Sequence, residues 1–241
     1  MQFQIIIFAA ALMTLLYGSY TDVRRRTVNS FLFIPLMAAS TAFYIYSGTG
    51  PIFIALSIIL FFLTFLRPDS ILYPIAGVAI LIASVFVMRI SGIQVGFNLT
   101  IMAVIYLSGF QERFFGIGDI KALVSVSYSF LGLPFLTPLT TSQEFLFTIM
   151  PLSLAILINV AILSMVFLPY ALFIMKRKSS GGVAPPFMMN YDEDFFQRNR
   201  GKFAVRELGG NRYLAYRTPF FIPITGGFLL TVIAGLWFML I

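Results

Sequence analysis

The sequence predicts an all-α polytopic membrane helix bundle, with about eight transmembrane helices and a short polar cytoplasmic loop. Three observations support this fold class. Hydrophobic residues make up 59% of the 241 residues and only 10% are charged, whereas soluble domains carry about 25% charged residues. The apolar residues fall in long runs, and nearly all cations lie between alternate runs. We therefore expect an integral membrane protein.

Eight runs have the composition of a spanning helix, which needs about 20 mostly apolar residues, or somewhat fewer when they are strongly apolar. They are Phe3–Tyr20, Val28–Ser47, Pro51–Leu66, Ser70–Met88, Gly92–Phe110, Ile120–Phe135, Phe145–Met175 and Pro219–Leu240. The seventh run contains Pro151 and Pro169, so we expect kinks, tilt or an interfacial first turn there. The chain then divides into a helix bundle at 1–175, a polar cytoplasmic loop at 176–218 and a final transmembrane helix at 219–241.

The cations predict how the chain is oriented in the membrane. With eight crossings, 15 of the 16 Lys and Arg residues lie on the side where the odd-numbered helices end, and only Arg89 lies on the other side. Positively charged loops stay in the cytoplasm, so we expect both termini outside. Because the cations follow one membrane face, the predicted partner is the lipid bilayer rather than nucleic acid.

Missing residue types narrow the possible chemistry. The sequence has no cysteine and no histidine, which excludes a disulfide framework, a thiol nucleophile and an imidazole proton shuttle. We expect neither a metal nor a cofactor. Acid–base chemistry must then come from carboxylates, tyrosines, lysines or arginines. Most of the nine acids lie in polar connections, which leaves Asp22 and Asp119 as candidates.

Asp22 and Asp119 are predicted to lie at the cytoplasmic ends of two different helices. Asp22 follows the first apolar run, and Asp119 immediately precedes the sixth. Acids on the same side of the membrane can meet, although 97 positions separate them. Two facing carboxylates share one proton. The ionised member can take a proton from water while the protonated member donates to a scissile carbonyl.

Four further residues are candidates for substrate binding or support of this pair. Gly116 and Gly118 lack a Cβ, so each could adopt a positive φ and let a substrate backbone approach the following acid. Lys121 could tune the pair or contact a lipid phosphate, and Asn29 could position a group. The acidic run at 192–194 is a further candidate, for attracting a basic substrate segment.

Each of these residues also has an ordinary explanation. Asp22 alone is typical of an interfacial cap, or of an ion-pair partner for Arg25 or Arg26. A Gly-x-Gly-Asp segment alone is typical of a glycine-rich turn ending in a helix cap. The alternative function is an ion- or proton-coupled transporter or channel subunit that uses the same two acids. A third alternative is a noncatalytic membrane scaffold.

Taken together, two segments resemble a known family. After an apolar helix, residues 22–29 read Asp-x-x-x-Arg-x-Val-Asn, and residues 116–121 read Gly-Ile-Gly-Asp-Ile-Lys. This pattern resembles the type IV prepilin peptidases, which are intramembrane aspartyl proteases of the Gly-x-Gly-Asp class. The resemblance implies that Asp22 and Asp119 are the catalytic pair. It also implies cleavage of basic leader peptides from prepilin or preflagellin (archaellin) precursors at the cytoplasmic face.

Departures from the family pattern refine this expectation. Bifunctional bacterial members carry a domain with paired Cys-x-x-Cys motifs and methylate the new N-terminus, and this cysteine-free sequence lacks those motifs. The layout is more similar to archaeal preflagellin and prepilin peptidases. Those often have six helices, so eight would need two additional crossings between the aspartates. Presenilin-like proteases are less similar, because Thr21 separates Tyr20 from Asp22.

Overall fold

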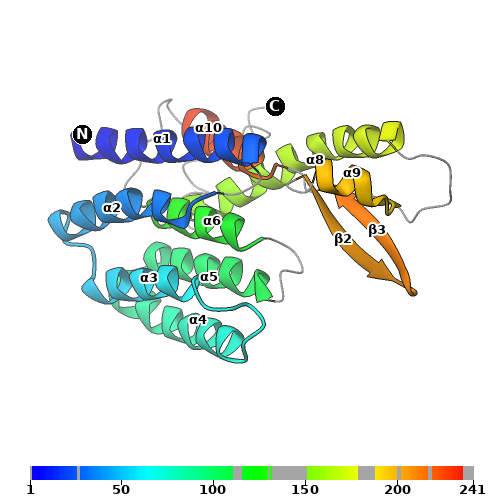
Figure 1. Ribbon diagram of the computed structural model, residues 1–241. Helices are drawn as coiled ribbons and strands as arrows, with labels where there is room; N and C mark the ends of the chain where they lie inside the picture. Colours follow the sequence, from blue (N-terminus) through cyan, green and yellow to red (C-terminus); the bar gives the residue numbers. More distant parts are fainter. Residues whose placement is uncertain are drawn as a thin grey trace.

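The computed structural model describes residues 2–25, 28–110, 116–129, 131, 151–178, 188–199, 202–216 and 219–235, and these ranges are predominantly helical (Figure 1). The helices are α1 (Gln2–Arg25), α2 (Ile34–Tyr46), α3 (Pro51–Leu63), α4 (Leu72–Ser91), α5 (Ile93–Ser108), α6 (Ile117–Ser129), α8 (Leu152–Lys178), α9 (Glu193–Arg198) and α10 (Phe221–Ala234). A short 3-10 helix, η1 (Ser30–Phe33), precedes α2. Each of the eight predicted runs therefore contains a helix.

The lengths of the helices bear on the predicted number of membrane crossings. Among the described residues, two helices are long and apolar enough to span a membrane, at Gln4–Arg25 and Leu72–Ser91. The other apolar helical stretches considered are shorter, at 10–17 residues, and for α8 this stretch is Leu152–Val166. For example, α3 has 13 residues, or about 20 Å at 1.5 Å per residue, against a hydrocarbon core about 30 Å thick. The count of eight transmembrane helices stays a prediction.

The two prolines of the seventh run lie in different positions. Pro151 immediately precedes α8, whereas Pro169 lies inside it. A proline before the first helical residue costs no helical hydrogen bond, because the first amides of a helix have no intrahelical partner. Pro151 therefore does not interrupt the helix. Parts of three predicted runs lie outside the described residues, at 130, 132–135, 145–150 and 236–240.

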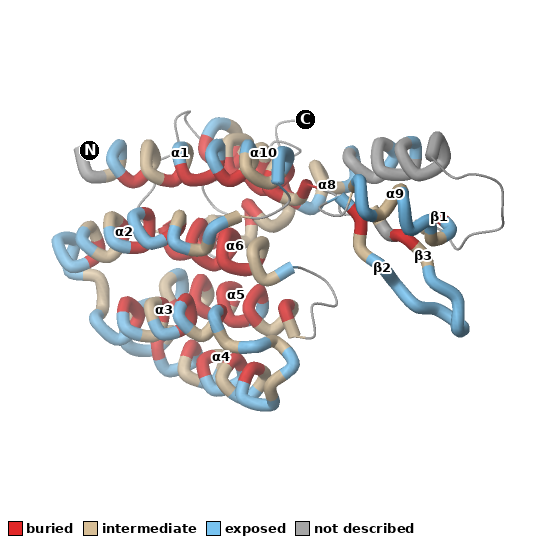
Figure 2. The backbone as a smooth tube through the Cα atoms, viewed as in Figure 1, coloured by how far each residue is buried: buried red, intermediate tan, exposed pale blue. Residues whose placement is uncertain are grey.

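The bundle is arranged around α6. Every residue from Ile120 to Ser129 is buried, and α6 contacts α1, α2, α3, α5, α8 and α10, so buried residues converge on it in Figure 2. Its serines do not need partners from other helices. The hydroxyls of Ser125 and Ser129 donate to carbonyls of the same helix, of Lys121 and Val126.

Helix ends gather as the alternating cation pattern predicts. Figure 1 shows that α1, α3, α5 and α8 end, and that η1, α4, α6 and α10 begin, on the same side of the helix layers. The acid-bearing end of α1 therefore lies on the same side as the acid-bearing start of α6. The helices α3 and α4 carry exposed apolar residues such as Phe62 and Phe86.

The polar segment at 176–218 differs from the expected loop. The helix α8 runs on to Lys178, and α9 then packs on a three-stranded antiparallel sheet of order β1-β3-β2, formed by β1 (Met188–Asn190), β2 (Phe203–Leu208) and β3 (Asn211–Tyr216). Met189, Phe203 and Leu214 form its small core. The described residues are mostly helical, as predicted, but this segment adds a small antiparallel sheet where a loop was expected.

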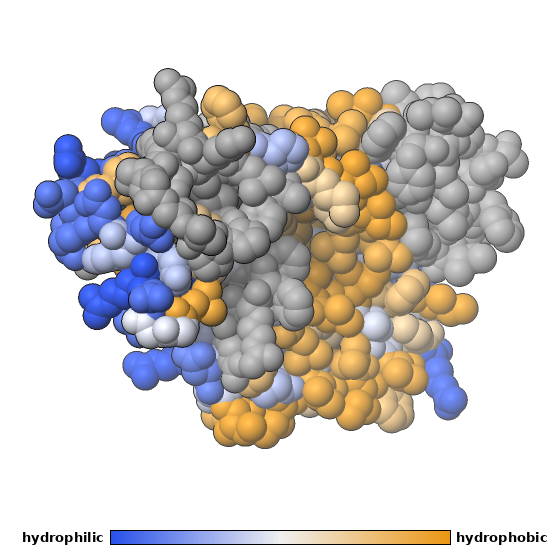
Figure 3. All heavy atoms as spheres, turned by 90° about the vertical axis from the view of Figure 1, so that its right-hand side faces the viewer, coloured by the Kyte–Doolittle hydropathy of each residue, from blue (hydrophilic) through white to orange (hydrophobic). Residues whose placement is uncertain are grey.

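Turn chemistry explains why a segment this polar forms a hairpin. Gly209 and Gly210 both have positive φ, which suits a two-residue turn between paired strands. Across the pair, Glu207 and Arg212 form an ion pair of 3.1 Å. In the end-on view of Figure 3, hydrophilic residues gather on one side, and hydrophobic residues cover much of the described surface beside them.

Candidate functional site

Asp22 is held by the first turn of another helix. Its Oδ2 accepts a hydrogen bond of 3.2 Å from the backbone N–H of Phe221, the first residue of α10. The first amides of a helix lack intrahelical acceptors and form its positive end. A carboxylate in this position satisfies one of those amides and is itself stabilised in its charged form.

Two side chains of α1 form hydrogen bonds with the backbone of Phe221. Its N–H donates to Asp22, and its carbonyl accepts from Ser19 Oγ at 3.1 Å. Thr225 adds to the contact, because its Oγ1 lies 2.8 Å from Ser19 Oγ, and its one hydroxyl proton can go to the Leu15 carbonyl at 3.2 Å or to the Phe221 carbonyl at 2.9 Å. We call Ser19, Asp22, Phe221 and Thr225 the α1–α10 clasp.

Gly18 allows the two helices to approach closely enough for the clasp to form. A Cβ at Gly18 would lie 2.7 Å from Cδ1 of the Phe221 ring, which is closer than such atoms can approach. The same ring stacks with Phe33, with ring centroids 6.1 Å apart. Position 18 therefore accommodates the aromatic ring that begins α10.

Asp119 lies in the first turn of α6 and caps that turn. Its own N–H donates to the Gly116 carbonyl at 3.0 Å, while its carboxyl accepts a hydrogen bond from the Gly116 backbone. The bond from the Gly116 N–H to the Asp119 carboxyl is one half of a capping box, and Gly116 has no side chain to form the other half. The helix-cap explanation of Gly-x-Gly-Asp is thus confirmed, and it also fixes where the carboxyl points.

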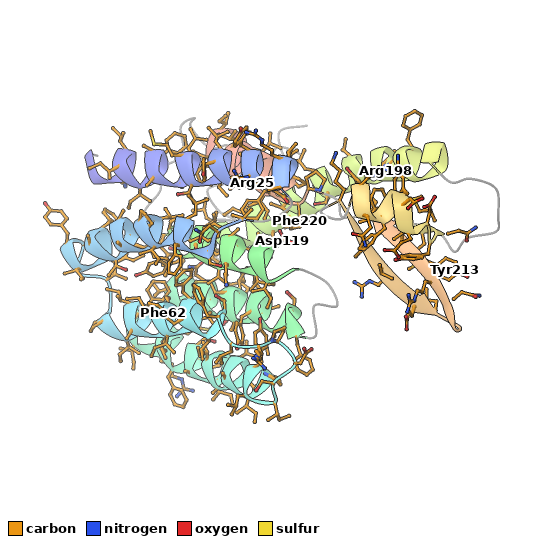
Figure 4. The ribbon with its side chains drawn as sticks, viewed as in Figure 1. Arg25, Phe62, Asp119, Arg198, Tyr213 and Phe220 are labelled. Atoms are coloured by element: carbon orange, nitrogen blue, oxygen red, sulfur yellow. The ribbon has the colours of Figure 1, made fainter. Side chains whose placement is uncertain are left out.

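The helices that carry the two acids contact each other, and the charge of Asp22 affects the pKa of Asp119. Burial of its carboxyl and, second, the charge of Asp22 raise the pKa of Asp119 from 3.8 to about 7, whereas the hydrogen bond from Gly116 lowers it. Asp119 lies outside the two helices long enough to span a membrane. Figure 4 places Asp119 close to Phe220, beside the end of α1 that carries Arg25.

The two glycines differ from the expectation and from each other. Neither has a positive φ, so that prediction is wrong, because Gly118 lies within α6 and Gly116 leads directly into it. A Cβ at Gly116 would lie 3.3 Å from Asp119 Oδ2, so the absence of a side chain makes room for the carboxyl. A Cβ at Gly118 would meet nothing within 4 Å. Apart from its chain neighbours, no described residue would contact a side chain at position 118.

Lys121 and Asn29 support the site from the other side of α6. Lys121 is only 7% exposed, and its Nζ donates to Ser30 Oγ at 2.8 Å and lies 3.9 Å from the centre of the Phe65 ring. The prediction that Lys121 contacts a lipid phosphate is therefore wrong for this conformation of its side chain. Asn29 caps η1, because its Oδ1 accepts from the Phe31 N–H at 3.0 Å. It orders the turn that presents Ser30 to Lys121.

The acidic run at 192–194 has local structural roles. Asp192 caps α9 by accepting from the Phe195 N–H at 3.0 Å. Glu193 accepts from Gln197 at 2.6 Å and from the Tyr191 hydroxyl. Two of the three acids are thus engaged within their own unit, and attraction of a basic segment stays a prediction.

Three residues of α1 that face α10 together with Asp22 escaped the sequence analysis, namely Leu15, Gly18 and Ser19. Leu15, Gly18, Ser19 and Asp22 are spaced as i, i+3, i+4 and i+7, so they share one face of α1. Small and hydroxyl-bearing residues on the face that carries the acid were the available signal. Nothing in the local sequence identified Phe221 as the partner.

Comparison with known proteins adds no relatives. No family model, no curated protein and no solved structure matches this chain. The resemblance to prepilin peptidases therefore rests on the motif residues themselves.

Proposed function

We propose that this chain is a membrane-embedded aspartyl endopeptidase that removes basic leader peptides from prepilin or archaellin precursors at the cytoplasmic face. Asp22 and Asp119 are the catalytic residues of this proposal. The observation that carries it is that α1 and α6 contact each other and bring the end that carries Asp22 and the start that carries Asp119 to the same side of the bundle, with the Asp22 charge raising the pKa of Asp119. Two acids that lie 97 positions apart and influence each other are what water activation by an aspartate pair requires.

The pair can perform hydrolysis without a metal or an imidazole. Near neutral pH the two carboxyls hold one proton, and the apparent pKa values belong to the pair. The ionised carboxylate removes a proton from water as the water oxygen attacks the scissile carbonyl carbon. The protonated carboxyl donates to the carbonyl oxygen, and breakdown of the resulting diol releases the acid and the amine.

Surface properties support a substrate that combines a leader with a hydrophobic helix. The outer faces of the helices expose large apolar side chains. They include Ile52, Ile59, Phe62, Ile75, Ile82 and Phe86. Apolar surface on this scale is typical of a lipid or protein contact. The hydrophobic helix of a precursor would pack there, and its leader junction would reach Gly118.

Cleavage of a precursor is the direct test. Membranes containing the full chain are mixed with a tagged prepilin, and the product is followed by its size on a gel and by N-terminal sequencing. Asp22→Asn and Asp119→Asn should each reduce cleavage by about 1,000-fold or more, since members of a catalytic unit fail singly. The matched control is Asp69→Asn, which changes an exposed acid in the connection before α4.

The outcomes separate the proposed protease from its alternatives. Cleavage by wild type and the Asp69 variant, with loss in both site variants at unchanged melting temperature, supports the protease. Normal processing by Asp22→Asn and Asp119→Asn would contradict it. Ion or proton flux that both site variants abolish, in a wild-type protein that cleaves no precursor, would support the transporter instead.

A further inference from the structure

The backbone donors to the two acids have different origins. Asp119 receives its hydrogen bond from Gly116, three positions earlier in the same turn. Asp22 receives its hydrogen bond from Phe221, which lies 199 positions away on α10. The donor to Asp119 therefore forms with the turn itself. The donor to Asp22 exists only while α10 is packed against α1.

The clasp gives this packing a defined hydrogen-bond pattern. Ser19 Oγ lies 3.1 Å from the Phe221 carbonyl, and Thr225 Oγ1 lies within hydrogen-bond distance of Ser19 Oγ and of the Leu15 carbonyl, so the first turn of α10 cannot slide along α1 without losing these contacts. Thr225 is 7% exposed, so water does not readily replace them. The Phe221 N–H is thereby kept at the carboxylate of Asp22.

The charged groups around Asp22 come from two helices. On its own helix, the described cations are Arg24 and Arg25, and Arg24 also donates to the Tyr20 hydroxyl at 2.6 Å. The helix α6 contributes Asp119 and Lys121, and the ammonium of Lys121 is held at Ser30. The described parts of η1, α2 and α10 carry no charged side chain. The backbone N–H of Phe221 thus adds to the cations of α1 in favouring the charged form of Asp22.

We propose that the α1–α10 clasp keeps Asp22 as the ionised member of the pair, so that Asp22 is the base and Asp119 is the acid. This inference rests on the proposed protease function and adds a role for each carboxyl. Ser19, Phe221 and Thr225 are positioning residues, because they act through Asp22. The raised pKa of Asp119 agrees with this division of roles, since it keeps that carboxyl protonated up to about pH 7.

The reaction closes with the roles assigned in this way. The carboxylate of Asp22 takes a proton from water, the water oxygen bonds to the carbonyl carbon, and Asp119 gives its proton to the carbonyl oxygen. In the second step Asp22 returns its proton to the amide nitrogen while Asp119 removes one from a diol hydroxyl, and the C–N bond breaks. One water is consumed, and both carboxyls return to their starting states.

The test compares cleavage as a function of pH in three threonine variants of the full-length protein. Thr225→Val removes the hydroxyl at nearly constant shape, and Thr225→Ser restores it. The matched control is Thr231→Val, on the same helix, whose hydroxyl accepts from Asn159 Nδ2 at 2.9 Å, away from Asp22. The substrate is the tagged prepilin used above.

Cleavage should rise with pH as Asp22 ionises and fall as Asp119 ionises. On the acidic side of the profile, Thr225→Val should shift the rise in cleavage to higher pH by about half a pH unit, in keeping with the loss of one helix-end contact. In Thr225→Ser and Thr231→Val, cleavage should rise at the same pH as in the wild type. A Thr225→Val profile that coincides with wild type would overturn the proposal. If Thr225→Val does not fold, Ser19→Ala takes its place with the same expectation.

A second measurement reads the carboxyls without requiring cleavage. Infrared spectra of the protein in lipid discs are recorded against pH, and Asp22→Asn and Asp119→Asn assign the protonated-carboxyl bands. The Asp22 band should disappear at lower pH than the Asp119 band, and Thr225→Val should narrow the gap. The reverse order would overturn the role assignment even if cleavage is observed. The expected order in a protein that cleaves no precursor would contradict the protease and leave the clasp supported.

Discussion

The two ends of α6 are built in opposite ways. At the far end, Tyr128 is fully buried, its hydroxyl lies 2.9 Å from Thr41 Oγ1, and its carbonyl accepts from the Tyr44 hydroxyl. Its ring stacks with Phe53 at a centroid distance of 5.8 Å. At the near end, Asp119 is partly exposed, and a Cβ at Gly118 would contact no described residue apart from its chain neighbours.

This difference separates stability from chemistry along one helix. Aromatic rings and paired polar groups close the far end, which is how a buried polar cluster becomes stabilising. The near end keeps an acid whose pKa is raised, on the same side of the bundle as a second acid. Departures from ideal packing are expected where a protein does chemistry. The predictions below test whether the two ends are as different as this comparison states.

The largest effect is expected at the far end. Tyr128→Ala should lower the free energy of unfolding by about 3–5 kcal/mol, because it removes a buried ring and the hydroxyl that pairs with Thr41 Oγ1. Thermal unfolding in detergent measures the change. Tyr46→Ala, at a tyrosine that is 75% exposed, is the control and should change stability little. Equal losses in the two variants would show that the far end is not specially stabilising.

At the near end, the pH dependence of cleavage should show one acidic group that must stay protonated. Because the folded-state pKa of Asp119 is about 7, above its ordinary value of 3.8, cleavage should fall about tenfold per pH unit well above 7. The same shift favours the folded state at low pH, and this contribution is lost as pH rises through about 7. Thermal unfolding of Asp119→Asn should lack that pH dependence. A rate that stays constant up to pH 9 would contradict the role of Asp119.

Gly118→Ala should separate the two properties at a single position. The added Cβ meets nothing within 4 Å, and alanine is a better helix residue than glycine, so the melting temperature should stay the same or rise. Cleavage should nevertheless fall about tenfold if a substrate backbone approaches this side, a loss equivalent to about 1.4 kcal/mol. Full activity in this variant would mean that the substrate reaches the acids by another route.

Gly116→Ala should have the smallest effect. Its Cβ would lie 3.3 Å from Asp119 Oδ2, so the carboxyl must move by a few tenths of an ångström. We expect a loss of cleavage of about threefold, which is smaller than the loss in Gly118→Ala. A parallel assay of the two alanine variants checks this order, and a larger loss at Gly116 would indicate that the carboxyl position is more critical than the space at Gly118.

Sequence alone determined which segments are helical and singled out two acids as candidates. Long apolar runs require backbone groups to bond within the segment, so each run contains a helix. The alternating cations also predicted that Asp22 and Asp119 lie at the same side of the bundle. The apolar runs and the alternation of cations between them depend on composition and order along the chain, which the sequence displays directly. The hairpin at 203–216 was missed because its strands are short and one face is polar.

Only the tertiary structure decided how the site is held together. The amide of Phe221 meets Asp22 across 199 positions, and Lys121 turns to Ser30 rather than to a surface. Neither contact has a local signature, because a side-chain pattern identifies the face of a helix but not the helix that packs on it. That choice depends on which ridges fit together, and here the absence of a Cβ at Gly18 makes room for the ring that begins α10.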